Sequence, residues 1–331
     1  MNKLDVGVVG TGHLGKLHIK MFRENENCSL IGINDSNTEQ AKLAADKFSV
    51  NVFESLESLL KNVNAISITA TTSAHYELAK ECLQAGKHLF IEKPITATIQ
   101  EAEEIVDLAN SLNLNLQVGH IERFNPALVS MEKYINDPKF IQTDRLAQFN
   151  PRGTDVAVVL DLMIHDIDII LSLIKSKVKN IEANGVAVVS NNIDIANARI
   201  QFENGAVANV TASRISQKKM RKMRIFQRDS YVALDFVTGV SEVYRLLPVE
   251  QEVKPSLISF GEIGVGDKKK RLVYEQPENK HINALKYELQ LFVDSVLENK
   301  EPVITGSDGL RALRIAKIII DKIQSSKVNL N

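Results

Sequence analysis

Asp161 and His165 are the side chains of this sequence best suited to moving a proton. They lie four positions apart in a predicted helix, so they share one face of it. A histidine with a pKa near the usual 6.5 or so, beside a carboxylate, suits general acid–base chemistry. The same pair, with Asp168 one turn further on, also suits a mutually satisfied structural contact on a buried helix, and the pattern leaves both interpretations open. A metal site would need a third ligand, which the sequence does not indicate.

A second candidate for chemistry is Lys93, which follows an apolar run and directly precedes Pro94. Proline restricts the residue before it to extended backbone, so the direction of the Lys93 side chain is constrained. An ammonium group there could polarise a substrate oxygen or take part in proton transfer. The alternative is a solvated surface lysine, the commoner fate of this residue type.

The N-terminal stretch predicts a dinucleotide site, because Gly10, Gly12 and Gly15 form G-x-G-x-x-G between an apolar strand and a helical pattern. The first glycine permits a tight turn and the second lets backbone approach a pyrophosphate. The third permits close helix packing, and the helix N-terminus faces the phosphates. A second predicted strand, 29–34, ends in Asp35, where a carboxylate meets ribose hydroxyls and repels a 2′-phosphate. The sequence therefore predicts NAD in preference to NADP.

The elements expected around these residues alternate between strands and helices as far as residue 120. Strands are predicted near 6–9 and at 29–34, 50–53, 65–69, 88–91 and 114–118. Such alternation predicts an α/β domain with a doubly wound parallel sheet, whose ligands lie at the carboxyl ends of the strands. On this rim we expect the cofactor residues Gly10, Thr11, Gly12, His13, Leu14, Gly15, Asp35, Thr71, Thr72, His75, Glu92 and Lys93.

The pattern changes beyond residue 120. Helices are expected at 126–135, 158–174, 283–297 and 309–323, and strands at 140–149, 178–190, 195–202, 206–213, 222–227 and 231–236. This predicts a second domain over residues 121–331, of α+β type, with a large and mostly antiparallel open sheet. The last helix is expected to pack back on the first domain.

Composition is that of an ordinary globular protein, with 44% hydrophobic and 24% charged residues. The net charge of -1 gives no overall attraction for nucleic acid or anionic membranes. Basic runs at 218–224 and 268–271 lack interleaved aromatic residues, so we interpret them as solvated rims or subunit contacts.

Cysteine usage and the chain start bear on the compartment. Cys28 and Cys82 lie far apart without a C-x-x-C partner and are expected to be free thiols in a reducing environment. The first strand is predicted too close to Met1 for a signal peptide, and no apolar run is long enough to span a membrane. We therefore expect a cytoplasmic protein.

Three motifs together resemble the Gfo/Idh/MocA oxidoreductases: Glu92-Lys93-Pro94 after a strand, Ser73-Ala74-His75 before a helix, and Asp161-x-x-x-His165. The resemblance extends over essentially the whole chain, including Ser307-Asp308-Gly309 before the last helix. It implies a Rossmann domain and a substrate domain whose open sheet forms the interface of a homodimer or homotetramer. It also implies an NAD-dependent dehydrogenase acting on CH–OH groups.

Carried over position by position, the resemblance makes Lys93, Asp161 and His165 the catalytic residues. Thr72 stands where many members carry proline, which changes the rigidity of that turn without affecting a catalytic role. The segment 118–126 is similar to members that oxidise the 3-hydroxyl of UDP-linked N-acetylhexosamines. The substrate residues expected on this basis are His120, Arg123, Asn125, Arg152 and His165.

Arg123 and Arg152 are the candidates for holding a diphosphate, because a planar guanidinium matches its oxygens. For Arg123 the alternative is a local pair or cap. The predicted function is therefore oxidation of a secondary alcohol of a sugar or nucleotide sugar. A dehydrogenase of a free polyol or aldose and a non-catalytic dinucleotide sensor are the alternatives, and a sensor would be expected to lack the lysine and histidine. We expect no nucleic-acid, membrane or metal partner.

Overall fold

The computed structural model describes residues 3–150, 156–278 and 282–326. The chain forms two compact units, which we describe separately. The first contains the chain as far as Ile121 together with Asn283–Arg314, and the second contains Glu122–Ile282 together with the chain from Ile315 onward. This division differs from the expected boundary, since residues 283–314 belong with the first unit rather than with residues 121–282.

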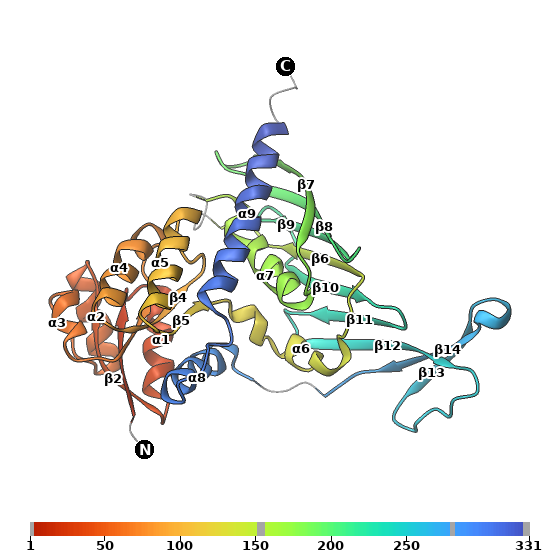
Figure 1. Cartoon of the computed structure of the whole chain (residues 1–331), viewed down its shortest axis with the longest axis horizontal. Helices are drawn as coiled ribbons and strands as arrows, with labels where there is room; N and C mark the ends of the chain where they lie inside the picture. The colour runs from red at the N-terminus through yellow and green to blue at the C-terminus, as the bar shows by residue number, and fades with distance from the viewer. Residues whose placement is uncertain (1–2, 151–155, 279–281, 327–331) are drawn as a thin grey trace. The chain divides into compact units, whose positions relative to one another are not determined.

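The first unit is built on a parallel sheet in the order β2-β1-β3-β4-β5 (Figure 1). Its strands are β1 (Leu4–Val9), β2 (Cys28–Asn34), β3 (Ala65–Ile68), β4 (His88–Glu92) and β5 (Leu116–Gly119). Apart from the edge strand β2, which is only partly buried, they are almost wholly buried, as expected for strands covered on both faces. Chain order reverses between β1 and β3, which makes their carboxyl ends the topological switch point where α/β sheets bind ligands. The strand expected at 50–53 is only an isolated bridge between Ile33 and Val52.

Helices cover this sheet. They are α1 (His13–Arg23), α2 (Thr38–Phe48), α3 (Leu56–Leu60), α4 (Thr72–Gln84), α5 (Ile99–Ser111) and α8 (Ala284–Leu297). α1 and α8 pack together against β1, and α4 packs against β3, β4 and α5. Phe22, Phe90 and Phe292 lie in one apolar cluster in which α8 completes the cover over β1. The return of α8 to the first unit is therefore driven by apolar burial.

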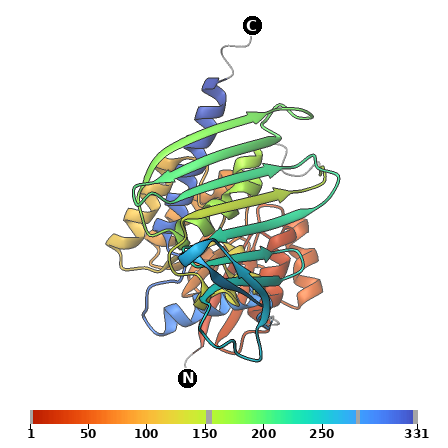
Figure 2. The ribbon, with the colours of Figure 1, turned by 90° about the vertical axis from the view of Figure 1, so that its right-hand side faces the viewer.

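The second unit holds a nine-stranded sheet in the order β13-β14-β12-β11-β10-β6-β9-β8-β7 (Figure 2). The strands are β6 (Phe140–Leu146), β7 (Val178–Val186), β8 (Ile195–Phe202), β9 (Val207–Ser213), β10 (Met220–Phe226), β11 (Ser230–Asp235), β12 (Val240–Pro248), β13 (Ile258–Ile263) and β14 (Lys270–Glu275). All neighbours are antiparallel except β6 and β9. The mostly antiparallel open sheet is confirmed, but the last three strands were not expected from the sequence.

Short helical segments complete the second unit. They are the 3₁₀ turns η1 (Ile121–Phe124), η2 (Glu132–Tyr134) and η4 (Gly266–Lys268), the helices α6 (Pro126–Val129) and α7 (Ile164–Leu173), and a π-helical turn, η3 (Val159–Met163). The helix expected at 126–135 is thus α6 followed by η2. α7 packs against β6 and β9, and η3 packs against β9. Helix α9 (Gly306–Ser326) is shared, with its part up to Arg314 in the first unit and the rest in the second.

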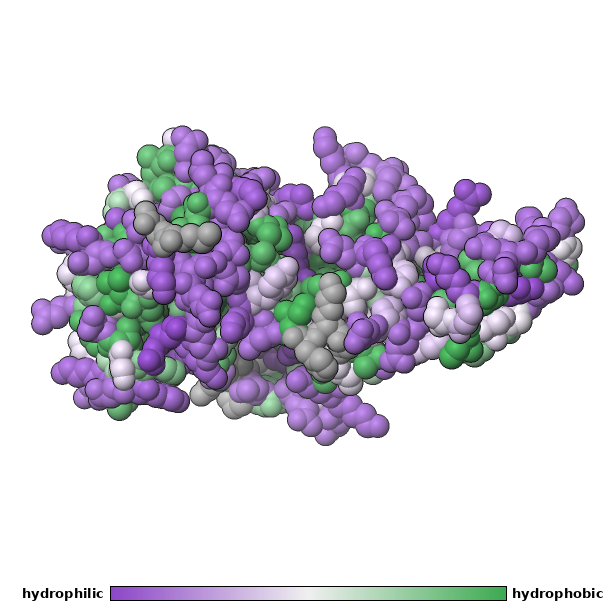
Figure 3. Space-filling model, turned by 90° about the horizontal axis from the view of Figure 1, so that it is seen from below, coloured by the Kyte–Doolittle hydropathy of each residue, from purple (hydrophilic) through white to green (hydrophobic). Residues whose placement is uncertain are grey.

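The sheet face turned toward the viewer in Figure 2 carries no helix of the described residues. Aromatic side chains form a row across it, which we call the aromatic row: Phe140, Phe226, Tyr231, Tyr244, Tyr274 and Phe260, with neighbouring ring centroids 4.7–6.4 Å apart. Green apolar surface is visible at the right-hand end of Figure 3, where β13 and β14 lie, and Val265 there is 86% exposed. No helix of the described residues is long and apolar enough to cross a membrane.

Candidate active site

The glycine turn between β1 and α1 has two positions closed to a side chain and one open position. Gly10 has a φ of 92°, and a Cβ there would lie 2.6 Å from the backbone nitrogen of Ala70. A Cβ on Gly15 would lie 2.0 Å from the carbonyl oxygen of Gly10. A Cβ on Gly12 would meet nothing within 4 Å. The fold itself thus requires Gly10 and Gly15, whereas at Gly12 the space is left for a ligand.

Asp35, just past the end of β2, is held by four hydrogen bonds. Its Oδ2 accepts from the Thr11 backbone N–H (2.6 Å), the Thr11 hydroxyl (2.8 Å) and the Gln40 amide (3.2 Å). Its Oδ1 accepts from the backbone N–H of Asn37 (2.8 Å). Burial favours the neutral acid, but these bonds outweigh it and lower the pKa of Asp35 below its usual value. The carboxylate is therefore a fixed negative charge at neutral pH.

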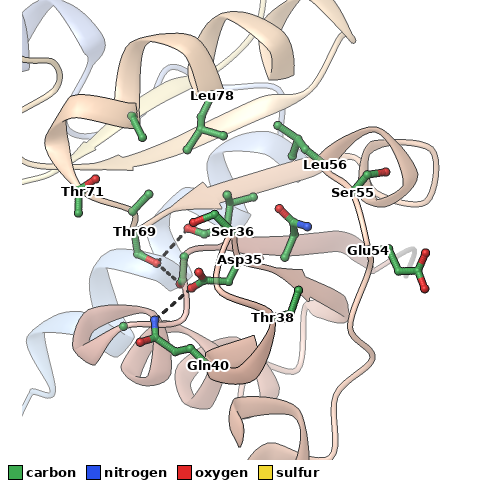
Figure 4. Close-up of a pocket in the computed structure, with 16 residues that line it drawn as sticks. Asp35, Ser36, Thr38, Gln40, Glu54, Ser55, Leu56, Thr69, Thr71 and Leu78 are labelled. Atoms are coloured by element: carbon green, nitrogen blue, oxygen red, sulfur yellow. Dashed lines mark hydrogen bonds between the residues drawn. The ribbon is translucent and has the colours of Figure 1, made fainter. Parts of the chain in front are cut away.

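A cavity of about 530 Å³ opens at the ends of β1, β2 and β3 (Figure 4). Asp35, Gln40 and Glu54 supply polar lining, and Leu56 and Leu78 supply apolar lining. Figure 4 shows Gln40 directed toward Asp35. A nicotinamide dinucleotide fits these residues, since the open glycine position suits its diphosphate, the carboxylate its ribose and the leucines its adenine.

Four of the expected cofactor residues line the cavity, and the other eight, Gly15 of the glycine turn among them, do not. Gly10, Gly12, Asp35 and Thr71 line the cavity. Thr11 is buried and holds Asp35, while His13 and Leu14 are exposed in the first turn of α1. Thr72, His75, Glu92 and Lys93 are not among the residues that line this cavity.

His75 and Glu92 organise the rim. The His75 ring contacts the carbonyl oxygens of Ala70 (3.1 Å) and Pro94 (3.0 Å), so it joins the chain ends of β3 and β4. Burial lowers the pKa of His75, which favours the neutral ring. The Glu92 Oε2 accepts a hydrogen bond from the Lys93 backbone N–H (3.3 Å). These contacts anchor the backbone on both sides of the half-buried Lys93, whose bond to Pro94 is cis.

His18 is a rim residue that sequence reasoning missed. Its ring is fully buried and contacts the Ser67 hydroxyl (2.9 Å) and Glu92 Oε1 (3.1 Å). His18 lies on the buried face of α1 together with Ile19, Met21 and Phe22. A titratable side chain on that face was the available signal, because buried polar groups require partners.

Asp161 and His165 are both half-buried. Asp161 lies just before α7, and His165 lies in its first turn. The segment does not form one regular helix, because Asp161 belongs to the π-helical turn η3 and His165 to α7. π-Helical turns are frequent at functional sites. Asp166 and Asp168, by contrast, are 2% and 1% exposed. The two pairs of polar residues are thus separated into a half-buried pair and a buried pair.

Arg123 is paired locally, which was one of the two alternatives for it. Its Nε and Nη2 donate to the two carboxylate oxygens of Asp168 at 2.7 and 2.6 Å. Asn125 caps α6 by accepting from the Ala127 backbone N–H, and its amide donates to the Phe236 carbonyl. His120 is buried at the end of β5. Arg152 lies outside the described residues.

Arg145 is a second residue whose role was not predicted from the sequence; it is 2% exposed on the inward face of β6. It donates to both carboxylate oxygens of Asp166 (2.9 and 2.8 Å) and to Glu122 Oε1 (3.0 Å). Ile141, Thr143 and Arg145 alternate into the interior of the unit. The period-two pattern of this strand was the available signal, because it places a charge inside the unit, where acidic partners are required.

The described residues contain no group of three or more His, Cys, Asp or Glu side chains placed to hold a metal ion. Asp161 and His165 supply two of the ligand types that zinc prefers, but structural and catalytic zinc sites use at least three protein ligands.

Two family models match the chain. One, described as an oxidoreductase family with an NAD-binding Rossmann fold, matches residues 4–120, and a Gfo/Idh/MocA C-terminal domain matches residues 134–229. The chain is 38% identical over 245 residues to UDP-N-acetylglucosamine 3-dehydrogenase of Acidithiobacillus ferrooxidans, a match covering 74% of this chain and 78% of that protein. A crystal structure of an enzyme of that name and organism superposes with a TM-score of 0.87 and 31% identity, over 98% and 99% of the two chains.

A more distant relative is myo-inositol 2-dehydrogenase of Thermotoga maritima, 22% identical over 345 residues and 98% of each chain. The fold, the dinucleotide cavity and these matches together define an NAD-binding dehydrogenase. The chain belongs to the Gfo/Idh/MocA oxidoreductase family. The family and fold class expected from the sequence are thus confirmed.

Two alanine substitutions in the glycine turn are expected to have opposite effects. Gly12→Ala should leave folding intact, because its backbone is extended and its Cβ meets no atom, but should weaken NAD binding about tenfold or more by obstructing the diphosphate. Gly15→Ala should lower the free energy of unfolding by about 1–3 kcal/mol through overpacking. NAD titration and urea denaturation of both variants test this. Equal destabilisation by the two, or undiminished NAD binding by Gly12→Ala, contradicts it.

Asp35 is expected to set the preference for NAD over NADP. Its fixed charge should make kcat/KM for NAD at least about tenfold higher than for NADP, because a 2′-phosphate would face a carboxylate. Asp35→Asn should reduce that ratio while keeping the acceptor oxygen. Glu54→Gln is the matched control, since Glu54 is the second carboxylate among the described residues of the cavity. A wild-type preference for NADP would overturn the assignment, as would an equal effect of both variants.

Proposed function

We propose that this chain oxidises the 3-hydroxyl of a UDP-linked N-acetylhexosamine with NAD as hydride acceptor. The observation that carries the proposal is the 38% identity to UDP-N-acetylglucosamine 3-dehydrogenase over three quarters of the chain. The structural likeness over 98% of the chain supports it. The cavity beside Asp35 is the proposed binding site of the dinucleotide.

The proposed chemistry assigns one task to each catalytic residue. Bound NAD supplies the acceptor for the hydride that leaves the substrate carbon. His165, half-buried in the first turn of α7, takes the hydroxyl proton as general base. Asp161 in the preceding turn orients the imidazole and stabilises the imidazolium. Lys93 holds the reacting oxygen and stabilises developing alkoxide charge, on a backbone anchored through Glu92.

For the substrate we retain His120, Asn125, Arg152 and His165 as proposed contacts. Arg123 has two guanidinium nitrogens on Asp168, which favours the local-pair alternative for this residue. Of the two arginines proposed for the diphosphate, Arg152 is therefore the stronger candidate.

We also propose a homodimer or homotetramer in the cytoplasm. The aromatic row on the open sheet face supports self-association through that face, because aromatic side chains are enriched at interfaces. Buried Cys28 and Cys82, which form no disulfide, are in keeping with a reducing compartment. Sedimentation equilibrium tests the assembly, and the mass of a single chain at micromolar concentration would exclude it.

The substrate assignment is tested by turnover. UDP-N-acetylglucosamine with NAD should give the absorbance of reduced nicotinamide, and myo-inositol and glucose serve as the contrasting substrates. UDP should inhibit competitively, since it would occupy the same site as the nucleotide sugar but carries no hydroxyl group in the position that is oxidised. Turnover of a free polyol without inhibition by UDP would exclude the nucleotide-sugar substrate and keep the dehydrogenase. NAD binding without turnover of any alcohol would favour a sensor.

His165→Ala and Lys93→Ala should each lower kcat by about 10²–10⁴, the usual contribution of acid–base assistance. NAD affinity should change little, because the cavity beside Asp35 contains neither residue. A base must be neutral to accept a proton, so wild-type oxidation should slow when the pH is lowered far enough to protonate the imidazole. Lys61→Ala, at an exposed pair with Glu57, controls for loss of a lysine. Near-normal kcat in either variant, or loss of NAD binding in both, contradicts these roles.

A further inference from the structure

Two neighbouring side chains of η1 are tied to two sides of helix α7. On one side Arg123 donates two parallel hydrogen bonds to Asp168, at 2.7 and 2.6 Å. On the other side Arg145 joins Glu122 (3.0 Å) to Asp166 (2.9 and 2.8 Å). η1 is therefore joined to α7 by two separate ion-pair contacts, one direct through Arg123 and one through Arg145 of β6.

These contacts bracket His165. At about 100° per residue, Asp166 lies about 100° around the helix from His165 in one direction, and Asp168 about 60° in the other. Both aspartates are buried, whereas His165 is half-buried. The ion pairs thus act on the two flanks of the helix face that presents the histidine.

The segment before α7 explains why these two ion-pair contacts are needed to orient His165. The π-helical turn η3 leads directly into Ile164, so a regular α-helical ladder does not determine the orientation of His165 from its N-terminal side. Bidentate arginine–carboxylate pairs are directional as well as strong. They can therefore set the rotation of the helix where the backbone pattern changes.

The environment of Arg123 argues against an anion site at that residue. Its side chain is 13% exposed, and the Asp168 carboxylate at bonding distance neutralises its charge. A diphosphate approaching this guanidinium would also approach that carboxylate. Like charges at short range oppose binding.

We propose that Arg123 is a positioning residue, whose pair with Asp168 sets the rotation of α7 and thereby the direction of the His165 imidazole, and that it is not the diphosphate contact. The inference rests on the proposed role of His165 as base. It extends that role by naming the side chains that hold the base in place.

The test uses two single variants of the full chain. Arg123→Lys keeps the charge but loses the paired geometry, and Asp168→Asn keeps the shape but loses the charge. Arg314→Lys, at the exposed pair with Glu103, is the matched control for the chemical change. Each protein is examined by NMR of ¹⁵N-labelled histidine, with the His165 signal assigned from His165→Gln, by UDP titration and by kcat at saturating substrate.

We expect Arg123→Lys and Asp168→Asn to move the His165 signal and its titration midpoint, and Arg314→Lys to leave both unchanged. Arg123→Lys and Asp168→Asn should each lower kcat about tenfold or more, since a small displacement of a catalytic base strongly reduces the rate. UDP affinity should change less than about threefold. A variant that combines Arg123→Lys with Asp168→Asn should have about the same kcat as either single variant, because both substitutions remove the same interaction. If Asp168→Asn fails to fold, Arg123→Lys carries the test with the same expectations.

Two outcomes overturn the inference. One is an unmoved His165 signal in Arg123→Lys. The other is a loss of UDP affinity of about tenfold or more in Arg123→Lys with undiminished kcat at saturation, which would make Arg123 the diphosphate contact. Failure of the proposed function is distinguishable, because absence of turnover with UDP-N-acetylglucosamine leaves the histidine signal as an independent readout.

Discussion

The ion pairs of the buried Arg145 guanidinium are the interaction on which the second unit depends. A charge with 2% exposure is tolerated only with opposite charges in bonding contact, and Asp166 and Glu122 provide them. The guanidinium also lies over the ring of Phe236, 5.9 Å from its centroid. Burial alone would lower the pKa of Arg145, but these carboxylates outweigh it and raise the pKa above its usual value. Removal of one partner from such a pair typically costs about 3–5 kcal/mol. β6, η1 and α7 are therefore joined at one point.

The first unit applies the same constraint at its ligand rim. Thr11, Asn37 and Gln40 hydrogen-bond to Asp35, while His18 and Ser67 occupy the space behind Glu92. Asp35 and Glu92 thus have partners on neighbouring elements, so this part of the rim is held in place by the protein itself. Such preorganisation reduces the cost of binding a dinucleotide and keeps Asp35 ionised where it selects among cofactors.

Local patterns allowed the cofactor half to be predicted. The roles of Gly10, Gly15 and Asp35 depend on a strand, a turn and a helix that are adjacent in sequence, and the clashes a Cβ would cause at the two glycines agree with the roles assigned from spacing. Strands β12–β14 were missed because nothing local required them, and β13 is exposed along its whole length. The return of α8 to the first unit was missed because Phe292 packs on a partner about two hundred positions earlier in the chain, Phe90.

By itself the sequence determined the family, the parallel α/β domain, the open antiparallel sheet and NAD as the cofactor, because each is encoded in short-range periodicity or in motif spacing. Only the tertiary structure decided which of the polar residues on the 161–168 helix are buried, and that Arg123 meets Asp168, 45 positions away. The helical pattern could not distinguish Asp161 from Asp166, since both are acidic residues within a largely apolar helical stretch. Asp166 is buried because Arg145 of β6 pairs with it, and that contact exists only once the sheet has formed.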